Sequence, residues 1–281
     1  MRILVTGAGG QLGEALRRVL EPRHAVVWTD REELDVRDLE AMRDCARAER
    51  PEAILHLAAV TQVDACESAP QMTFEVNALG ARYAALAARE CGARLLFTST
   101  DYVFDGEQER PYAEYDTPRP LNVYGWSKLH GERAIEALTE RHFIVRTSGL
   151  FGAGRPCFPE AILRAAAERG SVRVVGDQVC RPTFVAHLAE AIGALIETED
   201  YGRYHVASAG ATSWHAFARE ILDAAGMRRV RAEAITSAEL ARPAARPARS
   251  VLDTRAYELT RGRALPHRRD GLAEFLAQRR S

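Results

Sequence analysis

The chain has 281 residues, of which 47% are hydrophobic and 27% are charged, as in an ordinary globular protein. Its length suffices for one large domain or two closely packed ones. The net charge of -1 argues against a nucleic-acid binder or a protein of anionic membrane surfaces. No apolar run approaches a membrane span, and the N-terminus does not have the pattern of a signal peptide. We therefore expect a cytoplasmic protein with no nucleic-acid or membrane partner.

Short apolar runs alternate with longer helical patterns along the chain. The predicted strands are Arg2–Thr6, Ala25–Thr29, Ala53–Leu57, Arg94–Thr98, Phe143–Arg146, Arg173–Val175 and Tyr204–Ala207. The predicted helices are Gln11–Leu20, Leu39–Ala48, Gln71–Cys91, Val123–Thr139, Pro159–Arg169, Ala186–Glu197 and Trp214–Ala225. This alternation predicts an α/β fold with a doubly wound, parallel sheet of the Rossmann type, covered by helices on both faces.

The regular alternation weakens after about Gly149, which indicates a second, smaller lobe. We expect residues 1–150 to form the dinucleotide-binding domain, completed by about residues 177–207. Residues 151–176 and 208–281 would then form a C-terminal substrate lobe. The Pro-rich stretch Arg242–Arg249 is typical of extended loop, and the many arginines of the last third are expected on a solvated surface.

A glycine-rich turn follows the first predicted strand, with Gly7, Gly10 and Gly13 at three-residue spacing. Glycines let a pyrophosphate approach the backbone, and the N-terminus of the next helix offers it free N–H groups. Asp30 lies twenty positions after Gly10, where a carboxylate can bind an adenosine ribose. The neighbouring Arg31 could instead bind a 2′-phosphate. The residues therefore predict a nicotinamide dinucleotide and leave both NADH and NADPH open.

Lys128 is the only lysine among 38 lysine and arginine residues, and it lies four residues after Tyr124. On a helix this spacing puts both side chains on one face. Hydride transfer to a carbonyl needs a proton donor, and a tyrosine can be one if a nearby cation stabilises its phenolate. A compact ammonium suits that role better than a guanidinium. The hydroxyls of Thr98–Tyr102 end another strand at the carboxyl edge of the sheet, where ligands bind.

Longer segments extend this pattern over almost the whole chain. They are Thr6–Gly13, Leu57–Glu67, Ser99–Gly106, Pro120–Gly125 with Lys128 and Gly131–Glu132, Arg146–Ser148, Asp177–Gln178, Arg181–Thr183 and Arg246–Asp253. With these segments the chain resembles the extended short-chain dehydrogenases/reductases, and among them the dTDP-4-dehydrorhamnose reductase group. The resemblance implies that NADPH or NADH reduces the 4-keto group of a nucleotide-linked 6-deoxyhexose.

The resemblance also implies a role for each matching residue. Tyr124 would protonate the ketone oxygen, Lys128 would lower the pKa of Tyr124 and bind the ribose, and Thr100 would hydrogen-bond the same oxygen. The implied cofactor residues are Gly7, Gly10, Gln11, Leu12, Gly13, Asp30, Arg31, Asp35, Val36, Leu57, Ala58, Ala59, Tyr124 and Lys128. The implied substrate residues are Val60, Thr61, Val63, Thr100, Asp101, Tyr102, Asn122, Gln178, Arg181 and Arg246. The two arginines are candidates for diphosphate contacts.

The chain departs from the family pattern in two places. Gly149 stands where the family commonly has a tryptophan against the sugar, so the identity of the sugar stays open. Phe151 is a candidate replacement, although core packing is the favoured role for it. Ala15 stands where some reductases of the group carry a magnesium-binding glutamate, and the cysteines and histidines show no metal-ligand spacing. We therefore predict no metal.

Two alternatives to a reductase remain, a nucleotide-sugar epimerase and a non-catalytic dinucleotide-binding subunit like the regulatory subunit of methionine adenosyltransferase. The segment Thr100-Asp101-Tyr102 disfavours a dehydratase, which usually has Asp-Glu after the threonine. We expect a monomer or a homodimer, and the sequence does not decide between them.

Overall fold

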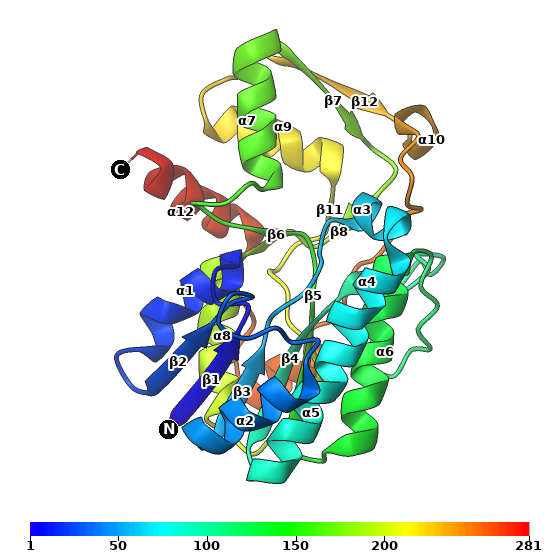
Figure 1. Cartoon of the computed structure of the whole chain (residues 1–281). Coiled ribbons are helices and arrows are strands. Elements are labelled where there is room, and N and C mark those ends of the chain that lie inside the picture. The colour runs from blue at the N-terminus through cyan, green and yellow to red at the C-terminus, as the bar shows by residue number, and fades with distance from the viewer. Residues whose placement is uncertain (281) are drawn as a thin grey trace.

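The computed structural model describes residues 1–280, and its central element is a six-stranded parallel sheet (Figure 1). In spatial order the strands are β10 (Gly202–His205), β5 (His142–Thr147), β4 (Arg94–Thr100), β3 (Ala53–His56), β1 (Arg2–Thr6) and β2 (Ala25–Thr29). Strands β2 and β3 pair with opposite sides of β1, so the direction of winding reverses between β1 and β3. Ligands of such sheets bind outside the carboxyl ends of the strands at this reversal.

Helices cover both faces of this sheet, as the sequence predicts. One face carries α1 (Gln11–Leu20) and α8 (Val185–Ile196), and the other carries α2 (Leu39–Glu49), α5 (Gly80–Cys91) and α6 (Val123–Leu138). Side chains of a strand alternate between faces, so Ile3 and Val5 join the core under α1 while Leu4 joins the core under α2. Strand β1 is apolar at all these positions because both of its faces are buried.

A smaller lobe lies beyond the carboxyl edge of the sheet, at the top of Figure 1. Its elements are α7 (Phe158–Arg169), α9 (Trp214–Ala224), α12 (Arg268–Arg280) and the parallel pair β7 (Ser171–Val175) and β12 (Arg231–Ile235). Phe151, Phe184, Phe217 and Phe275 pack together in its core. Two short strand pairs lie between the lobe and the sheet: β6 (Leu150–Phe151) with β9 (Thr183–Phe184), and β8 (Val179–Cys180) with β11 (Thr212–Ser213).

The chain returns from this lobe to the main sheet. Helix α11 (Arg255–Arg261) packs against β10, and α10 (Ser237–Leu240) precedes the extended stretch that leads to it. Tyr257 and Leu265 are buried in the same core as Ile3. The last third of the chain therefore contributes to both halves of the molecule.

The predicted helix Gln71–Cys91 is interrupted in the structure. It follows α3 (Val63–Ser68) and consists of α4 (Pro70–Phe74), the π-helical turn η1 (Glu75–Leu79) and α5. Asn77 in this turn is fully buried, and its side chain binds the backbone of Val60 and donates to Ser127 of α6. A wide turn of this kind occurs often near functional sites, and no periodicity in the sequence reveals it.

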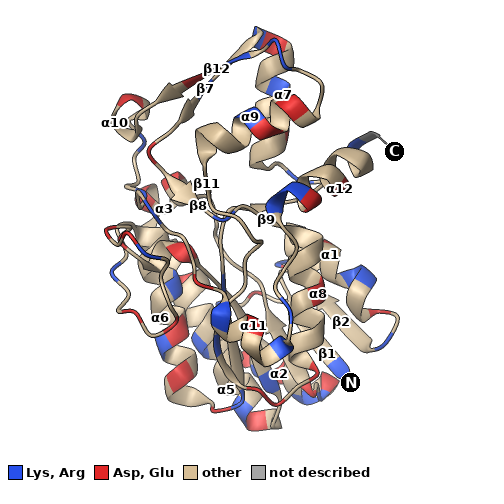
Figure 2. Cartoon of the chain, turned by 180° about the vertical axis from the view of Figure 1, so that it is seen from behind, with Lys and Arg blue, Asp and Glu red and all other residues tan. Residues whose placement is uncertain are grey.

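Acidic and basic positions alternate over both lobes (Figure 2), which fits the small net charge. Within residues 1–280 no helix is long and apolar enough to cross a bilayer. The same residues contain no group of three or more His, Cys, Asp or Glu side chains placed to hold a metal ion.

Candidate active site

One large cavity of about 1060 Å³ opens at the carboxyl edge of the sheet. Residues from the ends of β1, β2 and β3 (7, 9–13, 30–31, 34–37 and 57–63) form one side, which we call the sheet wall. Residues 149–150, 178–180, 214, 247 and 250 form the opposite side, which we call the lobe wall. All of the residues that the sequence assigns to the cofactor line this cavity. The topology therefore gathers them at the carboxyl edge of the sheet, where the sequence predicts the ligand site.

The glycine turn has the geometry that a diphosphate needs. Gly7 has φ +73°, and a methyl group there would lie 2.6 Å from the backbone nitrogen of Ala58. Gly10 is the N-cap of α1, and within residues 1–280 no side chain caps this helix. Its first N–H groups and the positive end of its dipole are thus left for an anion. These residues fit a dinucleotide cofactor.

The rim of the sheet wall is held by Asp30. One of its carboxylate oxygens accepts from the N–H of Gly9 at 2.9 Å, and the other accepts from the N–H of Arg31 at 3.0 Å. Arg155 reaches the same place from the lobe, where it donates to the carbonyl of Gly9 and pairs with Glu14 at 2.9 Å. Arg155 is not among the residues predicted from the sequence, where its only signal is a cation inside a loop rich in Gly and Pro.

Asp35 and Val36 line the cavity from the loop before α2. The guanidinium of Arg37 binds both oxygens of Asp35, and these hydrogen bonds lower the pKa of that carboxyl to about 2. Asp35 is therefore an anion at neutral pH, and Arg37 neutralises its charge at the cavity edge.

Tyr124, Lys128 and Thr100 line one part of the cavity, where α6 begins beside the end of β4. Lys128 is only 2% exposed, and its ammonium lies 4.0 Å above the ring of Phe97. Burial lowers the pKa of Lys128 to about 7, against an opposing effect of the Glu132 charge. Burial raises the pKa of Tyr124, and a hydrogen bond with Thr100 opposes the rise. The net shift of Tyr124 is thus opposite to the lowering expected from Lys128, and it keeps the phenol protonated.

Asp101 directly follows Thr100 and is 3% exposed. Its carboxylate accepts hydrogen bonds from the hydroxyls of Thr100 at 3.2 Å, of Ser148 at 2.9 Å and of Ser250. Burial raises the pKa of Asp101 to about 6, although these hydrogen bonds oppose the rise. The residue therefore ties the end of β4 to the segments that form the lobe wall.

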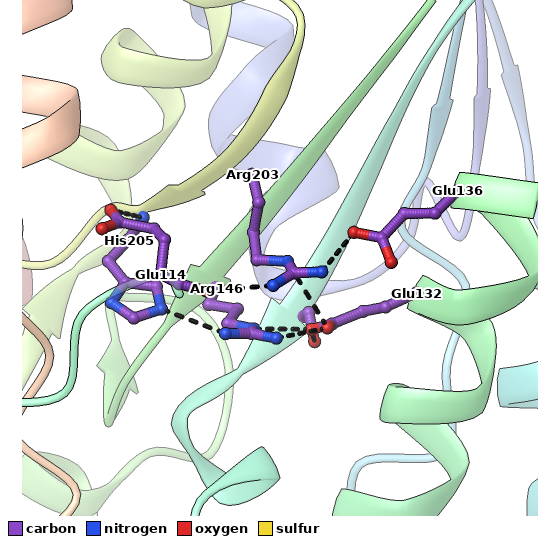
Figure 3. A network of polar contacts seen from close by, with 7 residues as sticks. Glu114, Glu132, Glu136, Arg146, Arg203 and His205 are labelled. Carbon is purple, nitrogen blue, oxygen red and sulfur yellow. Dashed lines mark hydrogen bonds and ion pairs between the residues drawn. The ribbon is translucent and has the colours of Figure 1, made fainter. Parts of the chain in front are cut away.

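Figure 3 shows a buried ion pair between β5 and α6, the helix that carries Tyr124 and Lys128. Arg146 of β5 and Glu132 of α6 are both fully buried, and the guanidinium donates to the two carboxylate oxygens at 2.8 and 2.6 Å. The hydroxyl of Ser99 donates to the same carboxylate. His205 lies beside Arg146, and its own burial lowers its pKa, so it adds no charge. The pair fixes α6, and with it Tyr124 and Lys128, to β4 and β5.

Three predicted substrate residues do not line the cavity. Asn122 caps α6, since its oxygen accepts from the N–H of Gly125 and its amide donates to the carbonyl of Ala245. The guanidinium of Arg246 binds both oxygens of Asp64 at 2.8 and 2.9 Å, so this arginine is not at the expected solvated surface. Arg181 donates to Thr254 and lines a second cavity of about 590 Å³. The diphosphate contacts predicted for the two arginines would require these pairings to change.

Phe151 does not replace the tryptophan that the family pattern has at position 149. It is fully buried and packs against Phe184 and Phe217 in the lobe core, the role that the sequence favours for it. Trp214, the first residue of the predicted helix Trp214–Ala225, lines the cavity. The sequence gives no signal for this, because its place depends on how the lobe folds over the sheet.

The comparisons with known proteins agree with this geometry. The family described as "RmlD substrate binding domain" matches residues 1–281. A dTDP-4-dehydrorhamnose reductase from Streptomyces griseus is 42% identical over 97% of this chain and 92% of the relative. The crystal structure of dTDP-4-dehydrorhamnose reductase from Bacillus anthracis in complex with NADP has a TM-score of 0.96 at 37% identity and covers 99% of both chains.

The chain belongs to the RmlD substrate binding domain family. A further structure of this group, from Clostridium acetobutylicum, has a TM-score of 0.97 at 35% identity and covers 100% of both chains. A UDP-glucose 4-epimerase from Thermus thermophilus shares the fold alone, with a TM-score of 0.82 at 24% identity over 100% of this chain and 99% of the epimerase chain. The predicted Rossmann fold and the family resemblance are thus confirmed.

Proposed function

We propose that the protein is an oxidoreductase that uses NADPH or NADH to reduce the 4-keto group of a nucleotide-linked 6-deoxyhexose. Relatives named dTDP-4-dehydrorhamnose reductase match nearly the full chain. The observation that carries the proposal is the joint position of Tyr124, Lys128 and Thr100 in the cavity that the glycine turn lines.

The chemistry divides between the cofactor and the protein. When bound, the dihydronicotinamide supplies a hydride to the carbonyl carbon. Tyr124 donates its phenolic proton to the carbonyl oxygen, which its raised pKa allows because the phenol is protonated before the reaction. Lys128 then stabilises the resulting phenolate, and Thr100 hydrogen-bonds the same substrate oxygen. The Glu132–Arg146 pair holds α6 in place during the transfer.

The two lobes of the chain would divide the binding of cofactor and substrate between them. Residues 1–150 with about 177–207 would hold the cofactor, and residues 151–176 and 208–281 would contribute the sugar-nucleotide side, except that α11 packs against β10 of the main sheet. We expect a cytoplasmic monomer or homodimer, and light scattering would distinguish the two states.

Substitution of Tyr124 by Phe tests the function directly. We expect the turnover of NADPH or NADH with dTDP-4-dehydrorhamnose to fall by about 10² to 10⁴-fold, since one proton donor is lost. Cofactor affinity should not change. Tyr112→Phe is the matched control, because that buried hydroxyl binds Asp105 outside the cavity. Turnover by the Tyr124→Phe protein at the wild-type rate would refute the assigned role.

The wild-type protein also separates the two alternatives. An epimerase would retain its oxidised cofactor through purification and interconvert sugar nucleotides without net oxidation of NADPH or NADH. A regulatory subunit would bind the cofactor, show no turnover and co-purify with a partner in fixed ratio.

A further inference from the structure

Trp214 reaches from the lobe into the active-site cavity. It is the first residue of α9, directly after Ser213, whose hydroxyl caps the helix. Its backbone N–H donates to the carbonyl of Gln178 at 3.2 Å, which fixes the start of the helix on the lobe wall. The side chain is partly exposed and lines the cavity together with Gly149 and Cys180.

Gly149 makes room for this indole. Its φ of +53° is a left-handed conformation that side chains rarely adopt. A methyl group at this position would lie 3.1 Å from Cη2 of Trp214 and 3.2 Å from Cα of Pro182. Contacts this short are rare, so the indole edge occupies space that a side chain at position 149 would need.

The indole lies near the reacting end of the cavity. Thr147 at the end of β5 pairs in register with Thr100, and Gly149 follows two residues later. Ser148 between them donates to Asp101, which in turn binds the Thr100 hydroxyl. Trp214 therefore adjoins the segment 147–149, which is linked to Thr100 by strand pairing and through Asp101. The glycine turn, in contrast, lies on the sheet wall.

The packing behind Trp214 keeps the ring in place. Its centroid lies 4.5 Å from that of Phe158 and 6.5 Å from that of Phe217, at the edge of the lobe core. A ring held in this way loses little conformational entropy when a ligand binds. A 6-deoxyhexose presents C–H groups and a methyl group, and an aromatic surface removes these from water.

We propose that Trp214 is the aromatic wall of the sugar subsite and that Gly149 is the residue that lets it reach the sugar. The proposal rests on the proposed function and names the part of the cavity that packs against the apolar face of the 6-deoxyhexose. Phe151 cannot serve in this way because the lobe core encloses it.

Tryptophan fluorescence tests the contact without any turnover. The chain has three tryptophans, so the variant Trp28→Phe/Trp126→Phe leaves Trp214 as the single reporter. We expect its emission to change on titration with dTDP-rhamnose, the product of the proposed reaction, and to change little with dTDP alone. An equal change with dTDP would place the indole against the nucleotide and overturn the proposal. No change with dTDP-rhamnose, with binding shown by calorimetry, would also overturn it.

Kinetic variants separate contact from packing. Trp214→Leu should raise the KM for the sugar nucleotide by about tenfold, which corresponds to about 1.4 kcal/mol, and leave the KM for NADPH unchanged. Trp214→Phe keeps an aromatic face and should stay within about threefold of the wild type. If both variants lose thermal stability while the KM for the sugar nucleotide stays at the wild-type value, Trp214 only packs the lobe.

A double-mutant cycle tests the part played by Gly149. In the wild-type background Gly149→Ala displaces the indole, so the KM for the sugar nucleotide should rise severalfold. In the Trp214→Leu background the same substitution should add no further rise, because no indole remains to be displaced. Additive effects would overturn the role of Gly149. Absence of turnover in the wild-type protein would instead refute the proposed function, while the fluorescence titration would still report on the subsite.

Discussion

The two walls of the active-site cavity are built in different ways. On the sheet wall, residues at three strand ends and one helix N-terminus line the cavity, and every residue assigned to the cofactor except Tyr124 and Lys128 lies there. On the lobe wall, residues from four separate segments line the cavity. The difference shows that a site made from the strand ends of a parallel sheet follows from local sequence patterns, whereas a site made from irregular, distant segments follows from their packing.

Two glycines show the contrast at the level of single atoms. Both have positive φ, +73° at Gly7 and +53° at Gly149. A side chain at Gly7 would meet the backbone of Ala58, which cannot move without breaking the sheet. A side chain at Gly149 would meet the edge of the Trp214 ring at 3.1 Å and the backbone of Pro182 at 3.2 Å, which are looser contacts than the 2.6 Å contact at Gly7. The sheet wall should therefore tolerate change less well than the lobe wall.

The largest expected effect concerns the buried ion pair of Glu132 and Arg146. Glu132→Gln leaves the buried charge of Arg146 without its partner, and we expect the free energy of unfolding to fall by about 3 to 5 kcal/mol in urea titrations. Glu136→Gln is the control, since that carboxylate pairs with Arg203 and is partly exposed, so its loss should cost less than about 1 kcal/mol. Equal losses of unfolding free energy in the Glu132→Gln and Glu136→Gln proteins would mean that the buried pair does not stabilise the site more than a surface pair does.

The next prediction tests the rigidity of the sheet wall. Gly7→Ala combines a left-handed backbone with a clash against Ala58, so we expect a loss of about 2 to 4 kcal/mol in stability and of NADPH binding. Gly92→Ala has a similar φ of +72° but open space around it, and should lose about 1 kcal/mol with normal NADPH binding. Thermal unfolding and NADPH fluorescence would measure both. Normal NADPH binding by the Gly7→Ala protein would contradict the claim that the sheet wall tolerates little change.

Asp101 ties the end of β4 to the lobe wall, and its pKa makes this connection depend on pH. The pKa of about 6 in the folded chain lies above the ordinary aspartate value of 3.8, so from about pH 4 to pH 6 the unfolded chain has lost this proton while the folded chain keeps it. Wild-type stability should therefore fall as pH rises through this window, by up to about 3 kcal/mol. Asp101→Asn should lack this contribution. A stability difference between the two proteins that is constant from pH 4 to pH 8 would contradict the assignment.

The smallest expected effect concerns the choice of cofactor at the rim of the sheet wall. Arg31 lines the cavity beside Asp30, where a 2′-phosphate would lie. We expect Arg31→Ala to raise the KM for NADPH by about tenfold and to leave the KM for NADH unchanged, because only NADPH carries that phosphate. Equal effects on both cofactors would show that Arg31 binds a part that they share.

The sequence by itself determined most of the sheet half. Alternating apolar runs predicted the six sheet strands to within a few residues, because a strand buried on both faces must be apolar throughout. The glycine turn, Asp30, and the Tyr124–Lys128 spacing also lay close together in the sequence or at strand ends. Their placement in one cavity follows from parallel strands alone, whose carboxyl ends share one edge.

Only the tertiary structure decided the lobe half. The pairing of β7 with β12, the return of α11 to the sheet, and the arrival of Trp214 beside Gly149 all join segments more than fifty residues apart. The ion pair of Arg246 with Asp64 also joins distant segments, and the sequence, which predicted a solvated surface for the arginines of the last third, could not reveal it. Such contacts have no periodic signal, because they depend on which buried surfaces meet after the local elements have formed.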